Sequence, residues 1–100
     1  MNYIFVNTKM NFTFQVDIET IKKSINQIFE NDDNEIKINN LQINPNMQHS
    51  NIEINLTYQI KSLNNFAFET KKIFFLIEQK INSLINTKPT NINLVFKGVY

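Results

Sequence analysis

The sequence predicts an α+β fold, a two-layer α/β sandwich in which two helices lie on one face of a mainly antiparallel sheet. Two segments carry apolar residues at helical spacing, and four others alternate apolar and polar residues as half-buried strands do. They follow one another in the order β-α-β-β-α-β, and strands with one polar face suit a sheet covered on one side only. The simplest such arrangement is a single domain, residues 1–100, of ferredoxin-like order.

The first half of the chain is expected to hold a strand and then a helix. Apolar and polar residues alternate over Phe12–Val16, which predicts the strand. Asp17 suits an N-cap, and the helix is expected over residues 18–30. A further short strand at Tyr3–Val6 has no assigned neighbour. The residues on the core face of the helix are Ile18, Ile21, Ile25, Ile28 and Phe29.

Two strands are expected in the middle of the chain. The first covers Ile36–Ile43, and its alternation slips at Asn39–Asn40, which predicts a β-bulge or bend. The second covers Ile52–Ile60 and has the most regular alternation in the sequence. A loop over Asn44–Ser50, which contains Pro45, joins the two strands.

A long helix and a last strand complete the predicted fold. The helix covers residues 66–85, with Asn65 as its N-cap, and Pro89 marks its end. A strand follows at Ile92–Phe96. The core face of the helix is expected to carry Phe66, Ile73, Ile77, Ile81 and Leu84, widened by Phe74 and Ile85.

The composition narrows the classes of function. The absence of cysteine excludes disulfides, thiol nucleophiles and cysteine zinc sites, and it fits a cytoplasmic protein. All ten basic residues are lysines and the net charge is +1, whereas nucleic-acid binders usually cluster basic residues and favour arginine. Nucleic acid is therefore disfavoured as a partner. No apolar run approaches the roughly 20 residues of a membrane span, so no direct span is expected.

The sequence lacks the residues that several catalytic and binding motifs require. Gly98 is the only glycine, which excludes phosphate loops, dinucleotide fingerprints and nucleophile elbows. His49, the only histidine, is interpreted as a solvated loop residue, because neighbours such as Ser50 rarely aim at each other in a loop. Residues 32–35 are interpreted as a polar turn, since Ile36 stands where a calcium loop needs an oxygen ligand. We expect no catalytic residue, no metal site and no cofactor.

The long helix carries the one surface feature that indicates a contact site. Phe68 and Phe75 lie seven residues apart and share a stripe nearly opposite the core face, flanked by Lys71 and Lys72. Apolar stripes with polar rims often mark contact sites. These four residues are the candidate protein-contact surface, for self-association or for a partner. The alternative is that Tyr3–Val6 folds over the stripe.

From residue 51 to residue 100 the chain resembles the alkaline-shock protein family, the Gls-type general-stress proteins of Gram-positive bacteria. The likeness lies in the alternating strand Ile52–Ile60, the helix with its spacing of apolar residues, and the closing strand Ile92–Phe96. The first half is similar more loosely, in Phe12–Val16 followed by Asp17. The abundance of residues with AT-rich codons also indicates a low-GC bacterial genome.

The chain departs from the family pattern at three turns where the family usually has glycine. Here the turns read Lys61–Asn65, Asn86–Lys88 and Asn31–Asn34. Asparagine tolerates positive φ better than most residues, so it can replace glycine in such turns.

The resemblance implies a non-enzymatic protein of the cell-envelope stress response. Family members are cytoplasmic and can be held at the inner face of the membrane by a small membrane anchor protein, and some assemble into homo-oligomers. The family brings no catalytic residues. The alternative function is a small RNA- or ribosome-associated module using a surface of Lys22, Lys23, Lys71 and Lys72. A small enzyme is the third hypothesis, and it would need two titratable groups that converge across strands.

Overall fold

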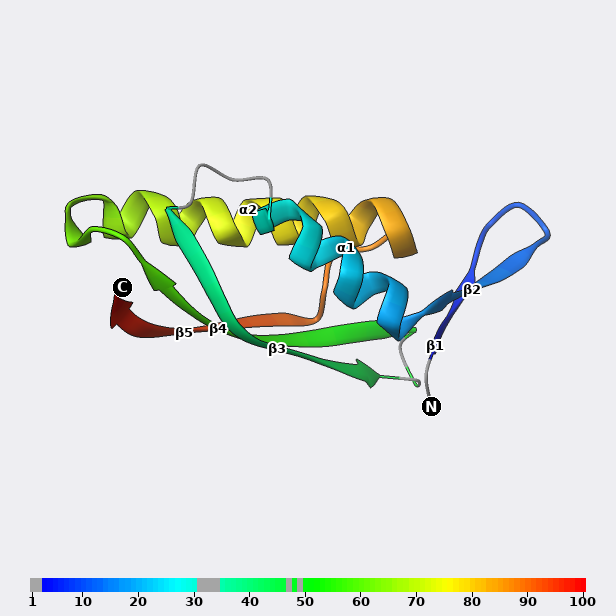
Figure 1. Ribbon diagram of the computed structural model, residues 1–100. Helices are drawn as coiled ribbons and strands as arrows, with labels where there is room; N and C mark the ends of the chain where they lie inside the picture. The colour runs from blue at the N-terminus through cyan, green and yellow to red at the C-terminus, as the bar shows by residue number, and fades with distance from the viewer. Residues whose placement is uncertain (1–2, 31–34, 47, 49) are drawn as a thin grey trace.

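The computed structural model describes residues 3–30, 35–46, 48 and 50–100, and has mixed α+β architecture. Helices α1 and α2 lie together on one face of a sheet, as the sequence predicted (Figure 1). In chain order the secondary-structure elements are β1 (Tyr3–Asn7), β2 (Thr13–Asp17), α1 (Ile18–Glu30), β3 (Ile36–Asn46), β4 (Asn51–Ile60), the 3₁₀ turn η1 (Leu63–Asn65), α2 (Phe66–Ile85) and β5 (Asn91–Val99).

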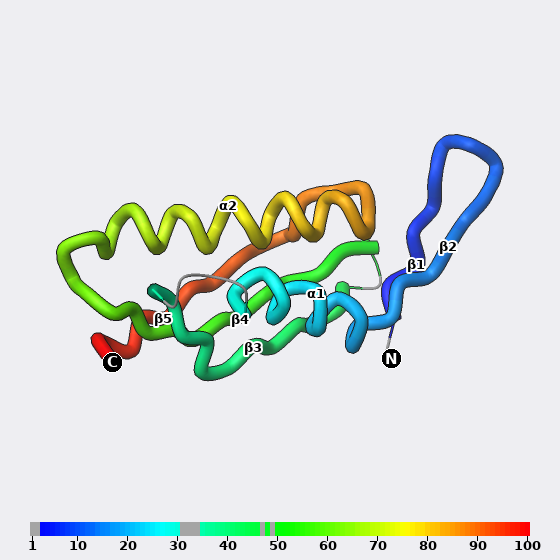
Figure 2. The backbone as a smooth tube through the Cα atoms, turned by 45° about the horizontal axis from the view of Figure 1, so that its top comes forward, coloured from blue at the N-terminus to red at the C-terminus, as the bar shows by residue number. Residues whose placement is uncertain are grey.

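The sheet under the helices has three strands in the order β3-β4-β5. β3 and β4 pair antiparallel, and β4 and β5 pair parallel because α2 carries the chain back across the sheet. β1 and β2 form a separate antiparallel hairpin that extends from one end of the molecule (Figure 2). The chain is elongated, with extents of 48 × 22 × 19 Å.

The ferredoxin-like strand order is wrong, because β2 does not join the main sheet. Its partner is β1, from Tyr3↔Asp17 to Asn7↔Thr13. Both edges of β4 are already occupied, by β3 and by β5. β2 also leads into α1 without a connecting residue, so the direction of the helix fixes where the strand can lie. The short strand predicted near Tyr3–Val6 exists, and β2 pairs with it outside the main sheet.

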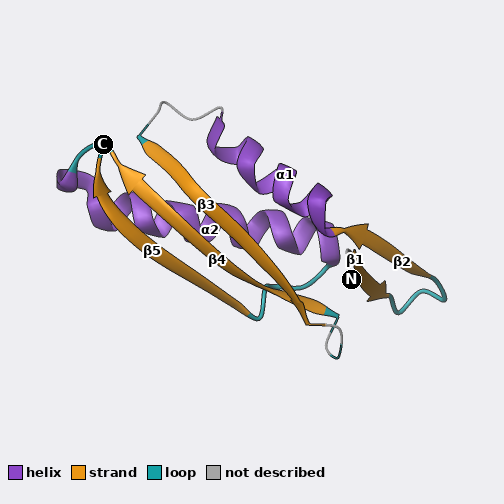
Figure 3. Cartoon of the chain, turned by 60° about the horizontal axis from the view of Figure 1, so that its bottom comes forward, coloured by secondary structure: helices purple, strands orange, loops and turns teal. Residues whose placement is uncertain are grey.

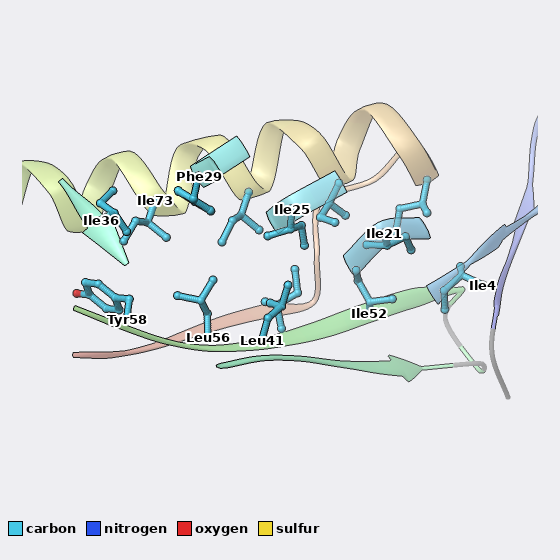
Figure 4. Close-up of a cluster of buried hydrophobic side chains, with 14 of the residues drawn as sticks. Ile4, Ile21, Ile25, Phe29, Ile36, Leu41, Ile52, Leu56, Tyr58 and Ile73 are labelled. Atoms are coloured by element: carbon cyan, nitrogen blue, oxygen red, sulfur yellow. The ribbon is translucent and has the colours of Figure 1, made fainter. Parts of the chain in front are cut away.

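The core lies between the sheet and the two helices (Figure 4). Every second side chain of β4 points to the helices and is at most 1% exposed. α1 contributes Ile21, Ile25 and Phe29, and the base of the hairpin contributes Ile4 and Val6. α2 contributes a stripe with a spacing of four residues, namely Glu69, Ile73, Ile77, Ile81 and Ile85.

Both helices begin and end at the predicted residues, but one predicted cap is wrong. Asn65 makes no side-chain capping hydrogen bond. Instead η1 precedes α2, and the N–H of Asn64 donates to Ser62 Oγ at 3.2 Å. The slip predicted at Asn39–Asn40 is confirmed as a register shift between Ile38 and Asn40.

Asn86 ends α2 in the left-handed conformation, with φ of 61°, and its N–H donates to the C=O of Asn82 at 2.9 Å. This confirms that asparagine supplies positive φ at the turn after the long helix. Glycine has no Cβ to strain in this conformation. We expect Asn86→Gly to raise the free energy of unfolding by about 0.5 kcal/mol, and Asn86→Ala to lower it by about 1 kcal/mol. Urea denaturation measures both, and equal effects of the two variants would contradict the expectation.

Candidate functional site

Phe68 and Phe75 lie on the face of α2 opposite its buried stripe, and they are 66% and 61% exposed. Lys71, between them along the helix, is exposed, whereas Lys72 is half-buried on the other flank. The structure therefore places Phe68, Lys71 and Phe75 on one exposed face. Phe68 and Phe75 together form an exposed apolar stripe on the outer face of the helix, and such stripes with a polar rim often mark contact sites.

The segment Tyr3–Val6 does not cover this face, because β1 pairs with β2 beyond the C-terminal end of α2 (Figures 1 and 2). Ile4 and Val6 are buried at the base of the hairpin instead. The sequence left two alternatives for the Phe68 and Phe75 stripe, a contact surface or burial under Tyr3–Val6. The second alternative, burial under this segment, does not occur.

Phe74 joins the exposed aromatic face, which the sequence did not predict. Phe74 is half-buried, and its ring centroid lies 5.4 Å from that of Phe75 at 69°, an edge-to-face arrangement. Phe75 also lines a shallow hollow with Glu78 and Lys88. Because Lys88 belongs to the connection between α2 and β5, Phe75 and Glu78 lie on the flank of α2 that faces the β5 side.

β5 is an outer strand of the sheet and has no described neighbour on its far side (Figure 3). Its helix-facing side chains, Ile92, Leu94 and Phe96, are only half-buried, although the equivalent β4 side chains are almost fully buried. At the end nearest the C-terminus, Phe96 packs against Phe66 with ring centroids 4.7 Å apart. The core is therefore open along this edge.

The outer face of the sheet is polar and carries side-chain amides. Asn93 Nδ2 donates to Asn55 Oδ1 at 3.2 Å, and Asn39 Nδ2 donates to Gln59 Oε1 at 3.0 Å. RNA-binding sheets usually display aromatic rings on which bases stack. Over this face the paired amides offer no such platform, and the one aromatic ring described beside it is that of Tyr100, near Lys37 Nζ, which disfavours the RNA alternative.

Among the described residues, no arrangement of side chains supports the enzyme hypothesis or a metal site. His49, Asp32 and Asp33 lie outside them. Within the described ranges no three His, Cys, Asp or Glu side chains gather as metal ligands. An open hollow of about 720 Å³ beside the hairpin has Lys9 as its one titratable lining residue, with Met10 and Phe12 among its apolar ones. None of the helices described is long and apolar enough to cross a membrane.

Glu69 is the one buried charged side chain among the described residues, at 5% exposure, and its Oε2 atom has no hydrogen-bond partner there. It lies in the buried stripe of α2 and lines none of the hollows described above. A buried carboxylate oxygen without a hydrogen-bond partner costs free energy.

Comparisons with protein-family models, curated proteins and solved structures found no match to this chain.

Proposed function

We propose that this protein is a non-enzymatic protein-binding scaffold whose contact surface is the aromatic face of α2. The observation that supports the proposal is the exposure of Phe68 and Phe75, at 66% and 61%, on a helix whose opposite face is buried. Exposed aromatic residues are favoured at contact surfaces because each covers much area at a low entropic cost. Lys71 adds a charge beside the aromatic rings.

The proposed role is cell-envelope homeostasis, with attachment to the inner face of the membrane through a small membrane protein. This part rests on the resemblance of residues 51–100 to alkaline-shock proteins. The outer face of the sheet supports a protein partner over RNA, since it carries paired side-chain amides where RNA-binding sheets carry rows of aromatic rings for base stacking.

Replacing Phe68 and Phe75 together by serine is expected to abolish self-association or partner capture and to leave the fold intact. Both side chains are exposed, so their loss removes contact area without opening the core. Light scattering over a concentration series measures self-association, and pull-down from membrane and ribosome fractions measures capture. The matched control is the double variant Lys23→Ser with Glu30→Ser, which changes two exposed residues with the same seven-residue spacing on the other helix, α1. Unchanged association and capture in the Phe68→Ser, Phe75→Ser variant would rule out this surface.

A further inference from the structure

We propose that a second copy of this chain pairs with the free edge of β5 across a two-fold axis. The two β5 strands then run antiparallel and join two three-stranded sheets into one of six strands. This inference rests on the proposed function and deepens it, because it names the partner as the chain itself and adds the strand edge to the contact surface.

The two outer strands of the sheet differ in how they are protected. β3 carries a register shift between Ile38 and Asn40 and has Pro45 near its end, two features that natural proteins use to block pairing at an edge. The first six residues of β5, Asn91–Phe96, contain no charge, no proline and no glycine, and the first charged residue is Lys97. An unprotected edge of this length favours pairing with another strand.

The free edge of β5 offers a regular row of backbone donors and acceptors. The N–H of Lys61 donates to the C=O of Glu35 at 3.0 Å. The backbone N–H and C=O groups of odd-numbered β4 residues therefore point to β3, and those of even-numbered β4 residues point to β5. In a parallel pair, when the backbone N–H and C=O of one residue bond to the neighbouring strand, the backbone groups of the residue opposite it point away from that strand. From Ile54 to Tyr58, even-numbered β4 residues lie opposite even-numbered β5 residues. The backbone groups that point to the free edge are therefore those of Ile92, Leu94 and Phe96.

Antiparallel pairing of two such edges is self-complementary. If the axis passes at Leu94, Ile92 lies opposite Phe96 of the second copy, and about six backbone hydrogen bonds form. Lys97 then faces Asn91 of the second copy, so no like charges oppose each other. The half-buried apolar side chains of the two strands become neighbours on the helix-facing side, where cross-strand apolar pairs are stabilising.

The β5-facing flank of α2 is self-complementary in the same way. Lys71 lies three residues before Phe74, and Glu78 lies three residues after Phe75. Two antiparallel copies of the helix therefore place Phe74 opposite Phe75 and each Lys71 opposite a Glu78 of the second copy. The aromatic pair stands at the centre of the contact, and opposite charges meet on either side of it.

One axis can serve both contacts. Phe66 touches Phe96, and from that point α2 and β5 run in opposite directions through the sequence along the same side of the molecule (Figure 1). Leu94 is about 7 Å from this contact along β5, and the midpoint between Phe74 and Phe75 is about 13 Å along α2. The two distances differ by about one helical turn. The distance along α2 is shorter when it is projected onto the strand direction, because the helix crosses the strands at an angle, and this reduces the difference.

Two charge variants test this arrangement without altering the core. Lys71→Glu places like charges across the axis in its own dimer, and so does Glu78→Lys. We expect the dissociation constant of each variant dimer to be roughly five-fold higher than that of the unmodified chain. An equimolar mixture of the two restores opposite charges at both contacts, so the mixed dimer should be about as tight as that of the unmodified chain, roughly five-fold tighter than either parent variant. Sedimentation velocity at low salt measures these constants.

Amide hydrogen exchange tests the strand edge directly. Exchange at Ile92, Leu94 and Phe96 should slow as the concentration of the unmodified chain rises through its dissociation constant, because pairing protects these N–H groups. The amide of Ile43, in the opposite outer strand, is the control and should not respond to concentration.

The outcomes separate this inference from the proposed function. A strict monomer up to roughly millimolar concentration overturns self-pairing, and capture of another protein through Phe68 and Phe75 then still supports the scaffold. A dimer in which the three β5 amides do not respond, or in which the mixture is no tighter than its parents, overturns this geometry and leaves the aromatic face as the contact surface. Loss of both association and capture in the Phe68→Ser, Phe75→Ser variant supports the proposed function whether or not β5 pairs.

Discussion

Ile77→Ala is expected to lower the free energy of unfolding by about 3 to 4 kcal/mol, the largest loss that we expect from a single side chain. Ile77 is fully buried at the middle of the α2 stripe that packs on the sheet. The change removes three carbon atoms and leaves a cavity that the stiff β4 strand beneath it cannot fill. A small domain has only about 5 to 15 kcal/mol of stability, so the loss is a large part of the total.

Phe75→Ala is the matched control on the same helix. It removes a larger side chain, but Phe75 is 61% exposed and lies on the opposite face, so we expect a change of less than about 0.5 kcal/mol. Urea denaturation at low micromolar concentration measures both variants under conditions that disfavour self-association. If Phe75→Ala cost as much as Ile77→Ala, α2 would not pack by the face that its buried stripe indicates.

The helices could be predicted from the sequence because their apolar spacing and their ends agree. In α2, Ile73, Ile77 and Ile81 recur every four residues, and Pro89 cannot continue the helix. The alternation over Ile52–Ile60 likewise marks a strand with one buried face, which β4 is. Local pattern was sufficient for these elements because their burial repeats along the chain.

The strand order could not be predicted, because pairing depends on contacts that periodicity does not encode. Thr13–Asp17 has the alternation of a strand that belongs to the main sheet, yet it pairs with Tyr3–Asn7 outside it. The parallel pairing of β5 with β4 is a consequence of the crossover through α2. Sequence periodicity gives the faces of a strand but not its neighbours.

The candidate surface was predicted in part. Helical geometry places Phe68 and Phe75 opposite the core, and their exposure agrees. Phe74 was expected to widen the core face, but it is half-buried and its ring packs edge-to-face on that of Phe75. The absence of charge and proline over Asn91–Phe96 was the available signal for an unprotected edge. It indicates such an edge only when β5 is known to be an outer strand, which the sequence did not show.

Replacing Glu69 by methionine is expected to raise the free energy of unfolding by about 1 to 2 kcal/mol, an effect opposite in sign to that of Ile77→Ala. Glu69 is 5% exposed, and its Oε2 atom has no hydrogen-bond partner among the described residues. Methionine has a similar volume and helix propensity, so it fills the same space and removes the cost of burying the charge.

Gln79→Met is the control for this change, because it adds the same side chain to an exposed position of α2 and is expected to alter stability by less than about 0.5 kcal/mol. Urea denaturation compares the two variants with the unmodified chain. A lower stability of Glu69→Met would contradict the argument, since it would mean that the carboxylate makes a stabilising interaction stronger than its desolvation cost. If the stability rises, the buried stripe of α2 that begins at Glu69 is limited by this one charge, and the apolar packing from Ile73 to Ile85 holds the helix on the sheet.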